Sequence, residues 1–581
     1  MDSPFWKGIS TLSFLAVIGL VFALILAQYL PPNSYNGAWH FFFQEHDSVL
    51  LLLFVILLFL FKKLDVSEDN RTLKDFSSHV DSKIVVTLIS LMVLLITFSG
   101  SHVVYHNFAL SMDEFLTVFQ AKIFNQGALL FPIDEQWRIF ARALQPLWVL
   151  FSPDTTSWVS SYYPVNALLH SIFLPFTQAH LASVLMAAAS IYLLSSITVK
   201  CLGKQHNAVF IAVILLALSP QFLITAMTPY AMTAHLFFNL LWLFFFMRAG
   251  KIAVSFSLIT GFLAIGLHQV HNFPAFVLPF IILLFIQRKR LLFVIHSLTY
   301  AAGLIFWIWW KGAYLPILET VPTVGSDAST FQHFINSIIK TTSRHDWTDL
   351  IAWPINFLRF ISWQHLLLFP LLVSAYYYRK QMNPMTRAMV WSVILSLVPY
   401  IIAMPIQGHG WGYRYLHGLL GNITLLAVFG WIQLQENTSD RKDLTKISTI
   451  FVASSLTMLL LVLPIRSFQT EAIVGAFSNS MKHIYSQQED VVLIDSQSIW
   501  YGIDLVRNEP NLSNKPKVML INSLTENGLK LLCSKHSVRL VTLKDLTSYG
   551  MLPNAGIDIN RLYQGYDQIL QRNNCQPATA N

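Results

Sequence analysis

Long apolar stretches alternate with short polar stretches along most of this chain. Most of the apolar stretches approach the roughly 20 residues that an α-helix needs to cross the hydrocarbon core of a bilayer. The pattern predicts an α-helical polytopic membrane protein with about thirteen transmembrane helices. The predicted helices cover residues 9–30, 48–62, 84–104, 179–200, 206–226, 235–250, 252–267, 273–287, 291–310, 361–378, 388–406, 415–433 and 447–464. The first stretch is longer than the apolar core of a signal peptide and lacks a small-residue cleavage site, so we expect it to remain as an anchor.

The composition of the 581 residues agrees with this pattern, since 54% are hydrophobic and only 12% are charged. Soluble proteins carry roughly a quarter charged residues, so this chain has too few charges to solvate a globular surface of its size. A soluble enzyme, a disordered chain and a fibrous protein are excluded. The net charge of +8 indicates membrane topology and not a nucleic-acid partner, because basic residues of membrane proteins gather in the loops that stay inside.

The distribution of Lys and Arg predicts the orientation of the helices. With the N-terminus inside, the inner loops hold nineteen Lys and Arg residues, whereas the longer outer loops before residue 465 hold eight. The reversed orientation contradicts the positive-inside rule in nearly every loop, and an odd number of spans places the C-terminus outside. We therefore expect a multi-pass protein of a bacterial-type inner or plasma membrane, with a cytoplasmic N-terminus and an extracytoplasmic C-terminus.

The predicted topology divides the chain into three parts. Residues 1–83 form an extra two-helix membrane segment with a cytoplasmic loop, residues 84–464 form the membrane core, and residues 465–581 form an extracytoplasmic domain. In the last part, short apolar strands alternate with helical patterns, which is typical of a small α/β domain. The expected strands are 491–494, 517–521 and 538–543, and the expected helices are 498–507 and 525–536.

The long outer loop 105–178 contains apolar residues at helical spacing, in groups too short for a membrane crossing. The groups are Leu116, Phe119 and Ile123, then Trp137, Phe140, Leu144 and Trp148. We expect two helices that lie along the membrane surface with their apolar faces down, and a third short helix after Tyr163. Arg138 and Arg142, four residues apart, lie on the opposite face of the second helix and are candidate binding residues.

Asp113 and Glu114 open the first of these surface helices, directly after a predicted span. Ser111, with Glu114 three residues later, fits a capping box, and acidic side chains favour a helix N-terminus. The acidic pair therefore has a purely structural explanation. On a helix, Glu114 points about 100° away from Asp113, so the two carboxylates cannot easily serve one substrate atom.

A second explanation of the acidic pair comes from the order of motifs around it. The pair is followed by residues 119–127, by Tyr162-Tyr163-Pro164-Val165-Asn166 and by residues 212–220. This order, over roughly residues 84–430, resembles that of the GT-C glycosyltransferases, and most closely the lipid A aminoarabinose transferases and protein O-mannosyltransferases. The resemblance implies a GT-C fold. It also implies that Asp113 is an essential catalytic carboxylate, which deprotonates the acceptor or orients acceptor and metal, with Glu114 in a secondary or structural role and Tyr163 in a substrate-binding element.

The chain departs from this family in its second outer loop, residues 228–235, which contains no Asp or Glu. His235 stands about where many relatives carry an acid. His268 and His271 share a helix face and stand where relatives often carry a basic residue that contacts lipid phosphate. Together with Asp113, these three histidines are candidate ligands of a divalent metal ion. Alternatively they bind phosphate when protonated, or only form hydrogen bonds at a wet membrane edge.

A second outer-face cluster lies at residues 408–417, where Arg414 is the only Lys or Arg. Its Trp and Tyr residues have a simple explanation as part of an interfacial aromatic belt. An unpaired charge at this depth is costly, however, and a guanidinium binds phosphate well through two hydrogen bonds. We therefore expect Arg414 to contact the phosphate of a lipid-linked donor.

These features predict an integral membrane glycosyltransferase. The resemblance implies an inverting transfer of sugar from a polyprenyl-phosphate-linked donor to an extracytoplasmic acceptor, which is a glycolipid, a polysaccharide or a protein. The donor's lipid tail would lie between spans, and residues 465–581 would serve acceptor recognition. The alternative is a transporter or flippase, or a ligase, of lipid-linked sugars. Transporters use intramembrane charges and inverted repeats, whereas the assigned spans contain no Asp or Glu and the chain shows no repeat.

The chain has three cysteines, Cys201, Cys533 and Cys575. They are too few for a disulfide scaffold and lack a Cys-x-x-Cys metal spacing. Cys533 and Cys575 both fall in the predicted outer domain, where disulfides persist, while Cys201 falls inside. We expect a Cys533–Cys575 bridge that closes the C-terminal domain.

Overall fold

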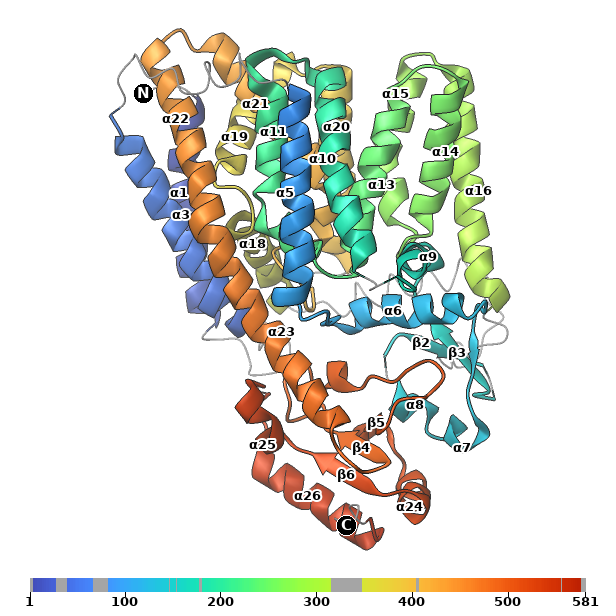
Figure 1. Ribbon diagram of the computed structural model, residues 1–581. Helices are drawn as coiled ribbons and strands as arrows, with labels where there is room; N and C mark the ends of the chain where they lie inside the picture. Colours follow the sequence, from blue (N-terminus) through green and yellow to red (C-terminus); the bar gives the residue numbers. More distant parts are fainter. Residues whose placement is uncertain are drawn as a thin grey trace.

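The computed structural model describes residues 4–27, 39–65, 82–145, 147–152, 154–176, 180–314, 347–403, 407–554 and 556–575. Most of the predicted outer loop 311–360 lies outside these residues. Figure 1 shows a bundle of long helices at one end of the molecule and a smaller region of short helices and strands at the other. Two three-stranded sheets lie in this smaller region.

Eight helical segments of the described residues are long and apolar enough to cross a membrane, so the protein is a multi-pass membrane protein. Six of them are α1 (Pro4–Ala27), α5 (Ser82–Val103), α10 (Leu181–Leu202), α16 (Arg290–Tyr314), α20 (Pro384–Ala403) and the continuous helix α22 (Arg441–Thr457), η6 (Met458–Val462) and α23 (Leu463–Tyr485). The other two combine the end of the π-helix η1 (Trp39–Asp47) with α3 (Ser48–Lys63), and η5 (Arg414–Leu419) with α21 (Leu420–Asn437). The other predicted spans coincide with shorter apolar helices of 10–17 residues. These are α11 (Ala208–Ala217), α13 (Ala231–Phe246), α14 (Lys251–Ile265), α15 (Asn272–Ile286) and α19 (Leu368–Tyr377). The exact count of thirteen spans remains a prediction.

Helix α21 forms the centre of the bundle. Its residues from Leu420 to Leu434 are all buried, and it packs against α19, α11 and α20. At Gly430 the backbone of α19 comes so close that a Cβ atom would lie 2.1 Å from the carbonyl oxygen of Leu371. Small residues permit such close contacts between membrane helices. Because η5 (Arg414–Leu419) leads directly into α21, the residues of η5 rest on a rigid support.

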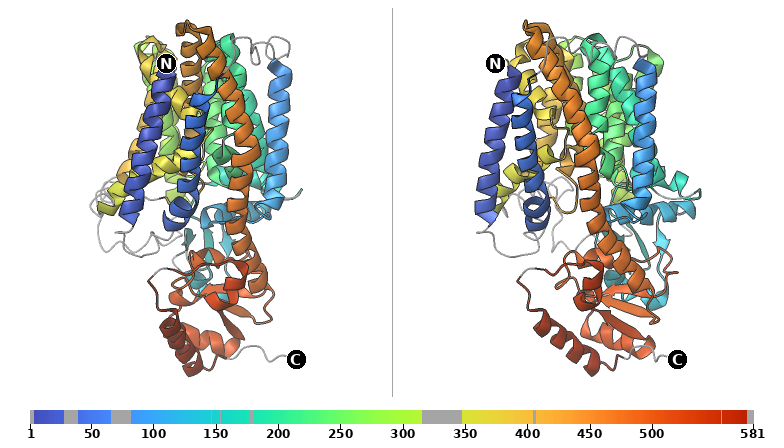
Figure 2. Two further views of the ribbon diagram at one scale, coloured as in Figure 1. Left: turned by 90° about the vertical axis from the view of Figure 1, so that its left-hand side faces the viewer. Right: turned by 60° about the vertical axis from the view of Figure 1, so that its left-hand side comes forward.

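The continuous helix α22–η6–α23 connects the bundle to the C-terminal part of the chain. It runs along the bundle and then beyond it, as the orange helix in Figures 1 and 2 shows. The predicted last span, 447–464, lies within this helix, but the helix continues to Tyr485. Residues 465–485 of the predicted C-terminal domain are therefore the end of this helix.

Helix α6 (Met112–Asn125) lies across the end of the bundle, where the sequence predicts a surface helix (Figure 1). The second predicted surface helix is wrong, because residues 137–148 contain only the single turns of α7 (Glu135–Arg138) and α8 (Ala141–Leu144). A residue before proline avoids the helical conformation, and Gln145, which precedes Pro146, has φ −148° and ψ 87°. The chain then forms an antiparallel sheet of β1 (Phe131–Pro132), β2 (Val149–Phe151) and β3 (Ser157–Ser160), followed by α9 (Pro164–Phe173), the predicted third helix.

The three predicted C-terminal strands are present as β4 (Val491–Ile494), β5 (Lys517–Leu520) and β6 (Val538–Val541). They form a parallel sheet in the order β5-β4-β6. Helix α24 (Glu526–Lys535) follows the predicted pattern, with Thr525 as its N-cap, and α25 (Leu543–Leu546) and α26 (Ile559–Arg572) complete this part. The predicted helix 498–507 is wrong, since only the short 3-10 helix η7 (Gly502–Leu505) forms there.

Both faces of the parallel sheet are buried, and they contact different parts of the chain. Successive residues of a strand point to opposite faces. Val492 and Ile494 share a hydrophobic cluster with residues of α23 such as Phe477, whereas Val491 and Leu493 share one with the outer loop 105–178. The loop residues of this second cluster are Leu116, Phe119, Ile123, Trp137, Phe140 and Leu144. They pack against the C-terminal sheet and not down onto the membrane as predicted, while Trp148 is exposed.

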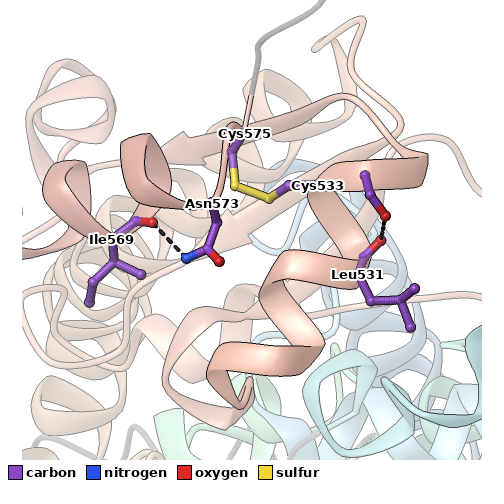
Figure 3. Close-up of a disulfide and its surroundings, with 6 residues drawn as sticks. Leu531, Cys533, Ile569, Asn573 and Cys575 are labelled. Carbon is purple, nitrogen blue, oxygen red and sulfur yellow. Dashed lines mark hydrogen bonds between the residues drawn. A yellow bond between two sulfur atoms is a disulfide. The ribbon is translucent and has the colours of Figure 1, made fainter.

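The predicted disulfide between Cys533 and Cys575 is present. Figure 3 shows it between α24 and the residue stretch that follows α26, close to the hydrogen bond that Asn573 donates to the carbonyl oxygen of Ile569. The bridge joins the last helix of the described chain to the sheet region. Cys201, in α10, is a free cysteine.

Candidate active site

Asp113 lies where the bundle meets the outer loop, and its carboxylate contacts three side chains from three other segments. The residue is only 6% exposed. Oδ1 accepts a hydrogen bond from the hydroxyl of Tyr162, and Oδ2 accepts one from the hydroxyl of Tyr230 at 3.1 Å. Nη1 of Arg414 lies 2.8 Å from the same Oδ2 and forms an ion pair with it. Two hydroxyl groups and one guanidinium group therefore contact the same carboxylate.

The start of α6 explains why Asp113 is free to take part in this cluster. Ser111 is the N-cap, and the carboxylate of Glu114 accepts a hydrogen bond from the Ser111 backbone N–H at 3.0 Å. The predicted capping box is therefore present, and Glu114 is the acid that serves it. Asp113, on another face of the same turn, points to Arg414. Glu114 thus makes the capping contact that its spacing from Ser111 predicts.

Burial strongly affects the acid–base properties of Glu114. The side chain is 3% exposed, and burial raises its pKa to about 8, although the hydrogen bond from Ser111 and the nearby charge of Arg507 act in the opposite direction. The pKa of Tyr162 is also raised well above its usual value, first by burial and then by the Asp113 carboxylate. Tyr162 therefore stays protonated and donates to Asp113.

Arg414 is held by the loop that precedes η5. Its backbone N–H donates to Oε1 of Gln407 at 2.9 Å, and Nη1 also donates to the carbonyl oxygen of His409 at 3.1 Å. The guanidinium lies 5.2 Å from the ring centroid of Tyr415 and 5.6 Å from that of Tyr230. The loop turns at Gly412, where φ is +63° and a Cβ atom would lie 2.5 Å from Oε1 of Gln221. Only glycine suits such a position.

The predicted histidines lie close to this cluster. The ring of His268 lies 4.3 Å from the ring of Tyr162, and the ring of His235 lies 6.3 Å from that of His268. His271 contacts Tyr400 at a ring distance of 5.5 Å. A small cavity of about 30 Å³ lies beside these residues. Its lining is Met232, His235, Asn239, Asn272, Ser396, Tyr400, Tyr415, Gly418 and Leu419.

The metal site predicted for the three histidines stays a prediction. Within the described residues, no group of three or more His, Cys, Asp or Glu side chains is arranged to hold a metal ion. Nε2 of His235 lies 3.3 Å from Nδ2 of Asn272, and Oδ1 of Asn272 accepts a hydrogen bond from the hydroxyl of Tyr400. His235 and His271 thus make hydrogen-bond and ring contacts of the kind that one of the predicted explanations expects.

The other predicted binding residues lie farther along the outer loop. Arg138 lies in α7, where its Nε donates to the carbonyl oxygen of Ile133 at 3.0 Å, and Arg142 lies in α8. Tyr163 is the N-cap of α9, and its ring lies 6.4 Å from that of Trp307. Its neighbour Tyr162 makes the contact with Asp113, and a substrate-binding role of Tyr163 stays a prediction.

A second buried charge cluster, which the sequence did not indicate, supports the Arg414 loop from the other side. Asp47 forms ion pairs with Arg359 and Arg466, both at 2.8 Å, and accepts a hydrogen bond from the indole of Trp363 at 2.7 Å. Arg359 also donates to the carbonyl oxygen of Gly410 at 2.9 Å. Asp47 lies within the apolar segment Phe42–Lys63. It directly precedes the predicted span 48–62, which itself contains no acidic residue.

The chain is similar to two solved structures. No family model matches the chain, and no curated protein matches it. Among solved structures, it is similar to ArnT from Cupriavidus metallidurans bound to undecaprenyl phosphate, with 12% identity, 74% of this chain and 86% of that chain covered, and a TM-score of 0.45. The apo state of ArnT gives 12% identity, 71% and 84% coverage, and a TM-score of 0.40.

Proposed function

We propose that this protein is an integral membrane glycosyltransferase that moves a sugar from a polyprenyl-phosphate-linked donor to an extracytoplasmic acceptor. The observation that carries the proposal is the buried ion pair of Asp113 and Arg414, with hydroxyls of Tyr162 and Tyr230 on the same carboxylate. An inverting transfer needs a base for the acceptor and a cation for the leaving phosphate. Asp113 and Arg414 are suited to these two roles.

The hydrogen bonds of Arg414 leave one edge of its guanidinium for a phosphate. Nη1 is used by Asp113 and His409. Among the described residues, Nε is buried without a hydrogen-bond partner, and Nη2 has one long contact of 3.5 Å with the Tyr415 hydroxyl. Nε and Nη2 form the edge through which arginine binds phosphate with two parallel hydrogen bonds. A phosphate at this edge would satisfy the buried Nε.

An apolar cavity next to Arg414 suits the lipid part of such a donor. The cavity measures about 250 Å³ and lies between α18 (Trp347–Ser362), α19, α20, η5 and α21. Tyr413 and Leu416, on either side of Arg414 in the sequence, are part of its lining. The other lining residues are Trp353, Phe357, Phe360, Phe369, Leu372, Val393, Leu397, Ile401, Ile423 and Leu426. A prenyl chain gains free energy by leaving water for such a lining.

The proposed reaction is a single displacement. An acceptor hydroxyl attacks the anomeric carbon of the donor sugar from the side opposite the lipid phosphate, and Asp113 takes the hydroxyl proton. The new carbon–oxygen bond forms while the bond from the anomeric carbon to the phosphate oxygen breaks. The polyprenyl phosphate leaves with the electron pair, and Arg414 stabilises its added charge. Because the donor phosphate uses Nε and Nη2, Nη1 of Arg414 can keep its contact with Asp113 and so hold the carboxylate beside the reacting groups.

A transporter or flippase of lipid-linked sugars is the alternative. Transport through the bundle would require a buried carboxylate that exchanges its partners. Asp47 is a buried carboxylate in the bundle. It has fixed partners, however, because Arg359, Arg466 and Trp363 all contact it at 2.7–2.8 Å. This arrangement favours a fixed support over a transport site, and so favours the enzyme.

The test uses the purified full-length protein in lipid nanodiscs. Polyprenyl phosphate carrying a radiolabelled sugar is added together with an extract of cell-envelope glycolipids, polysaccharides and proteins. We expect label to move from the donor to a component of the extract, with release of polyprenyl phosphate. Movement of intact labelled donor across the membrane of a sealed vesicle, without transfer, would instead identify a flippase.

A further inference from the structure

The C-terminal part of the chain contacts both halves of the candidate active site through one short segment, Gly502–Asn508. Asp504 and Arg507 in this segment are 3% and 4% exposed. Neither residue touches Asp113 or Arg414, yet each holds the backbone next to one of them. We propose that Asp504 and Arg507 are positioning residues, which set the distance and orientation of the Asp113–Arg414 pair. The inference rests on the function proposed above.

Asp504 bridges the two segments that carry the pair. Its Oδ1 accepts a hydrogen bond from the backbone N–H of Met112 at 3.0 Å. Met112 is the first residue of α6 and directly precedes Asp113. The other oxygen, Oδ2, lies 2.8 Å from Nε2 of His409, whose carbonyl oxygen in turn accepts a hydrogen bond from Arg414. One carboxylate therefore links the backbone beside Asp113 with the residue that holds Arg414.

Arg507 fixes the chain just before α6. Its Nη1 and Nη2 donate to the carbonyl oxygens of Ala109 and Leu110, the second at 2.5 Å. Nε donates to the carbonyl oxygen of Asp504 at 2.6 Å, so the two positioning residues also hold each other. The guanidinium lies 4.1 Å from the ring centroid of Phe108. The turn that starts α6 thus depends on side chains from nearly 400 residues farther along the chain.

Aromatic rings exclude water from the contact between Asp504 and His409. The ring of Tyr501 lies 3.7 Å from the His409 ring, and those of Trp500 and Phe477 lie 5.8 Å and 5.9 Å away. Charge interactions are stronger in such surroundings than in water. A change at Asp504 should therefore move the Arg414 loop and the start of α6 relative to each other. A misplacement of about 1 Å costs roughly 100-fold in rate when reacting groups must be aligned.

The same interface offers a matched control. Nζ of Lys122, near the other end of α6, lies 2.6 Å from Oε1 of Glu509, two residues after Arg507. Both side chains are about one-third exposed, at 34% and 38%. This ion pair joins the same two parts of the chain, but far from Asp113 along the helix. Glu509→Gln should therefore loosen the interface without moving the pair.

The experiment compares Asp504→Ala, Asp504→Asn and Glu509→Gln in the full-length protein. For Asp504→Ala we expect kcat to fall by about 10- to 100-fold, with a small change in KM for the donor. Asn keeps an acceptor for the Met112 N–H, so Asp504→Asn should lose less, and Glu509→Gln should keep wild-type kcat. Equal kcat in all three variants, or losses of activity that follow only the melting temperature, would overturn the proposal.

A second measurement separates this inference from the proposed function. Amide hydrogen exchange of peptides that cover residues 108–115 reports on the start of α6 whether or not the protein transfers sugar. We expect faster exchange there in Asp504→Ala and unchanged exchange in Glu509→Gln. Unchanged exchange in Asp504→Ala would contradict the positioning role, whereas an inactive wild-type protein with faster exchange in Asp504→Ala would contradict only the proposed function.

Discussion

Nη1 of Arg414 lies 2.8 Å from Oδ2 of Asp113, although 301 residues separate the two in the sequence. Asp113 belongs to the helix that crosses the end of the bundle, and Arg414 leads into α21 at the bundle's centre. The pair thus joins the outer loop to the most enclosed helix of the membrane region. This relationship underlies the proposed function.

The first prediction concerns the two parallel hydrogen bonds that the guanidinium of Arg414 would donate to the donor phosphate. Arg414→Lys keeps the positive charge for Asp113, so the protein should fold, but an ammonium group cannot bind phosphate through two parallel hydrogen bonds. A hydrogen bond to a charged group contributes about 1.5–3 kcal/mol, which corresponds to roughly a 10- to 150-fold loss in kcat/KM. Steady-state kinetics with varied donor concentration measure this loss. A lysine variant with wild-type kcat/KM would show that Arg414 does not bind the donor phosphate through two parallel hydrogen bonds.

The second prediction concerns Asp47. Asp47→Asn leaves Arg359 and Arg466 buried without a carboxylate, and removal of one partner from a buried ion pair costs about 3–5 kcal/mol. Arg466 is fully buried, so solvent cannot replace the lost partner. Denaturant unfolding in detergent should show a lower free energy of unfolding. Because Arg359 also donates to the carbonyl oxygen of Gly410, the Arg414 loop should lose stability as well. A variant as stable as the wild type would mean that Asp47 contributes little to this support.

The third prediction follows from the pKa of Glu114, which burial raises to about 8 in the folded protein from 4.5 in an unperturbed side chain. The folded state therefore binds more protons between these two pH values, so Glu114 lowers stability progressively as the pH rises through this window. Glu114→Gln keeps an oxygen that accepts from the Ser111 N–H but does not ionise. Its melting temperature should fall less than that of the wild type between pH 5 and pH 8. Parallel curves for the two proteins would contradict the raised pKa.

The fourth prediction concerns the side of the membrane on which the C-terminal region lies. Disulfides persist outside the cytoplasm, and the Cys533–Cys575 bridge agrees with the orientation that the Lys and Arg distribution predicts. An alkaline phosphatase fusion after residue 581 should be active, and a fusion near residue 70 should not be. Alkylation without reductant should label Cys201 alone. Free thiols at Cys533 and Cys575, or the opposite fusion pattern, would contradict this orientation.

The sequence predicts those features that local patterns determine. Apolar runs locate the long helices, the spacing of Ser111 and Glu114 predicts the start of α6, and the rarity of charge at the outer face draws attention to Arg414. Contacts between distant segments are not visible in such patterns. Tyr230 lies in the loop 228–235, in which the sequence pattern pointed only to the missing acid and to His235. Asp47 lies just before the predicted span. The arrangement of these residues becomes apparent only when the helices pack.

In the region 498–507, contacts with distant segments prevent the helix that the local pattern predicts. Its apolar residues have helical spacing, but Ile499, Trp500 and Leu505 are buried in a hydrophobic cluster that includes residues of α23 and the outer loop. Asp504 and Arg507 make tertiary hydrogen bonds with residues 109–112. These contacts outweigh a local helical preference, which is weak by comparison. Arg138 and Arg142 are predicted on one face of a single helix, but they lie in the separate turns α7 and α8, between which Phe140 leaves the helical conformation.

The central claim is that Asp113 is the base of the reaction, and Asp113→Asn tests it most directly. Asparagine keeps the shape of the side chain and removes the proton acceptor, and general-base catalysis contributes about 10²- to 10⁴-fold in rate. Ser111→Ala is the matched control, since it changes the N-cap of the same helix two residues away. Asp113→Glu, which retains a negative charge for Arg414, shows whether any loss of folding comes from the broken ion pair.

The deciding measurement is the rate of sugar transfer per folded molecule for these variants in nanodiscs, with the folded fraction determined by thermal unfolding. We predict that Asp113→Asn loses at least about 100-fold in this rate, while Ser111→Ala stays close to the wild type. If folded Asp113→Asn retains most of the wild-type rate, Asp113 is not the base, and its pairing with Arg414 is a structural contact.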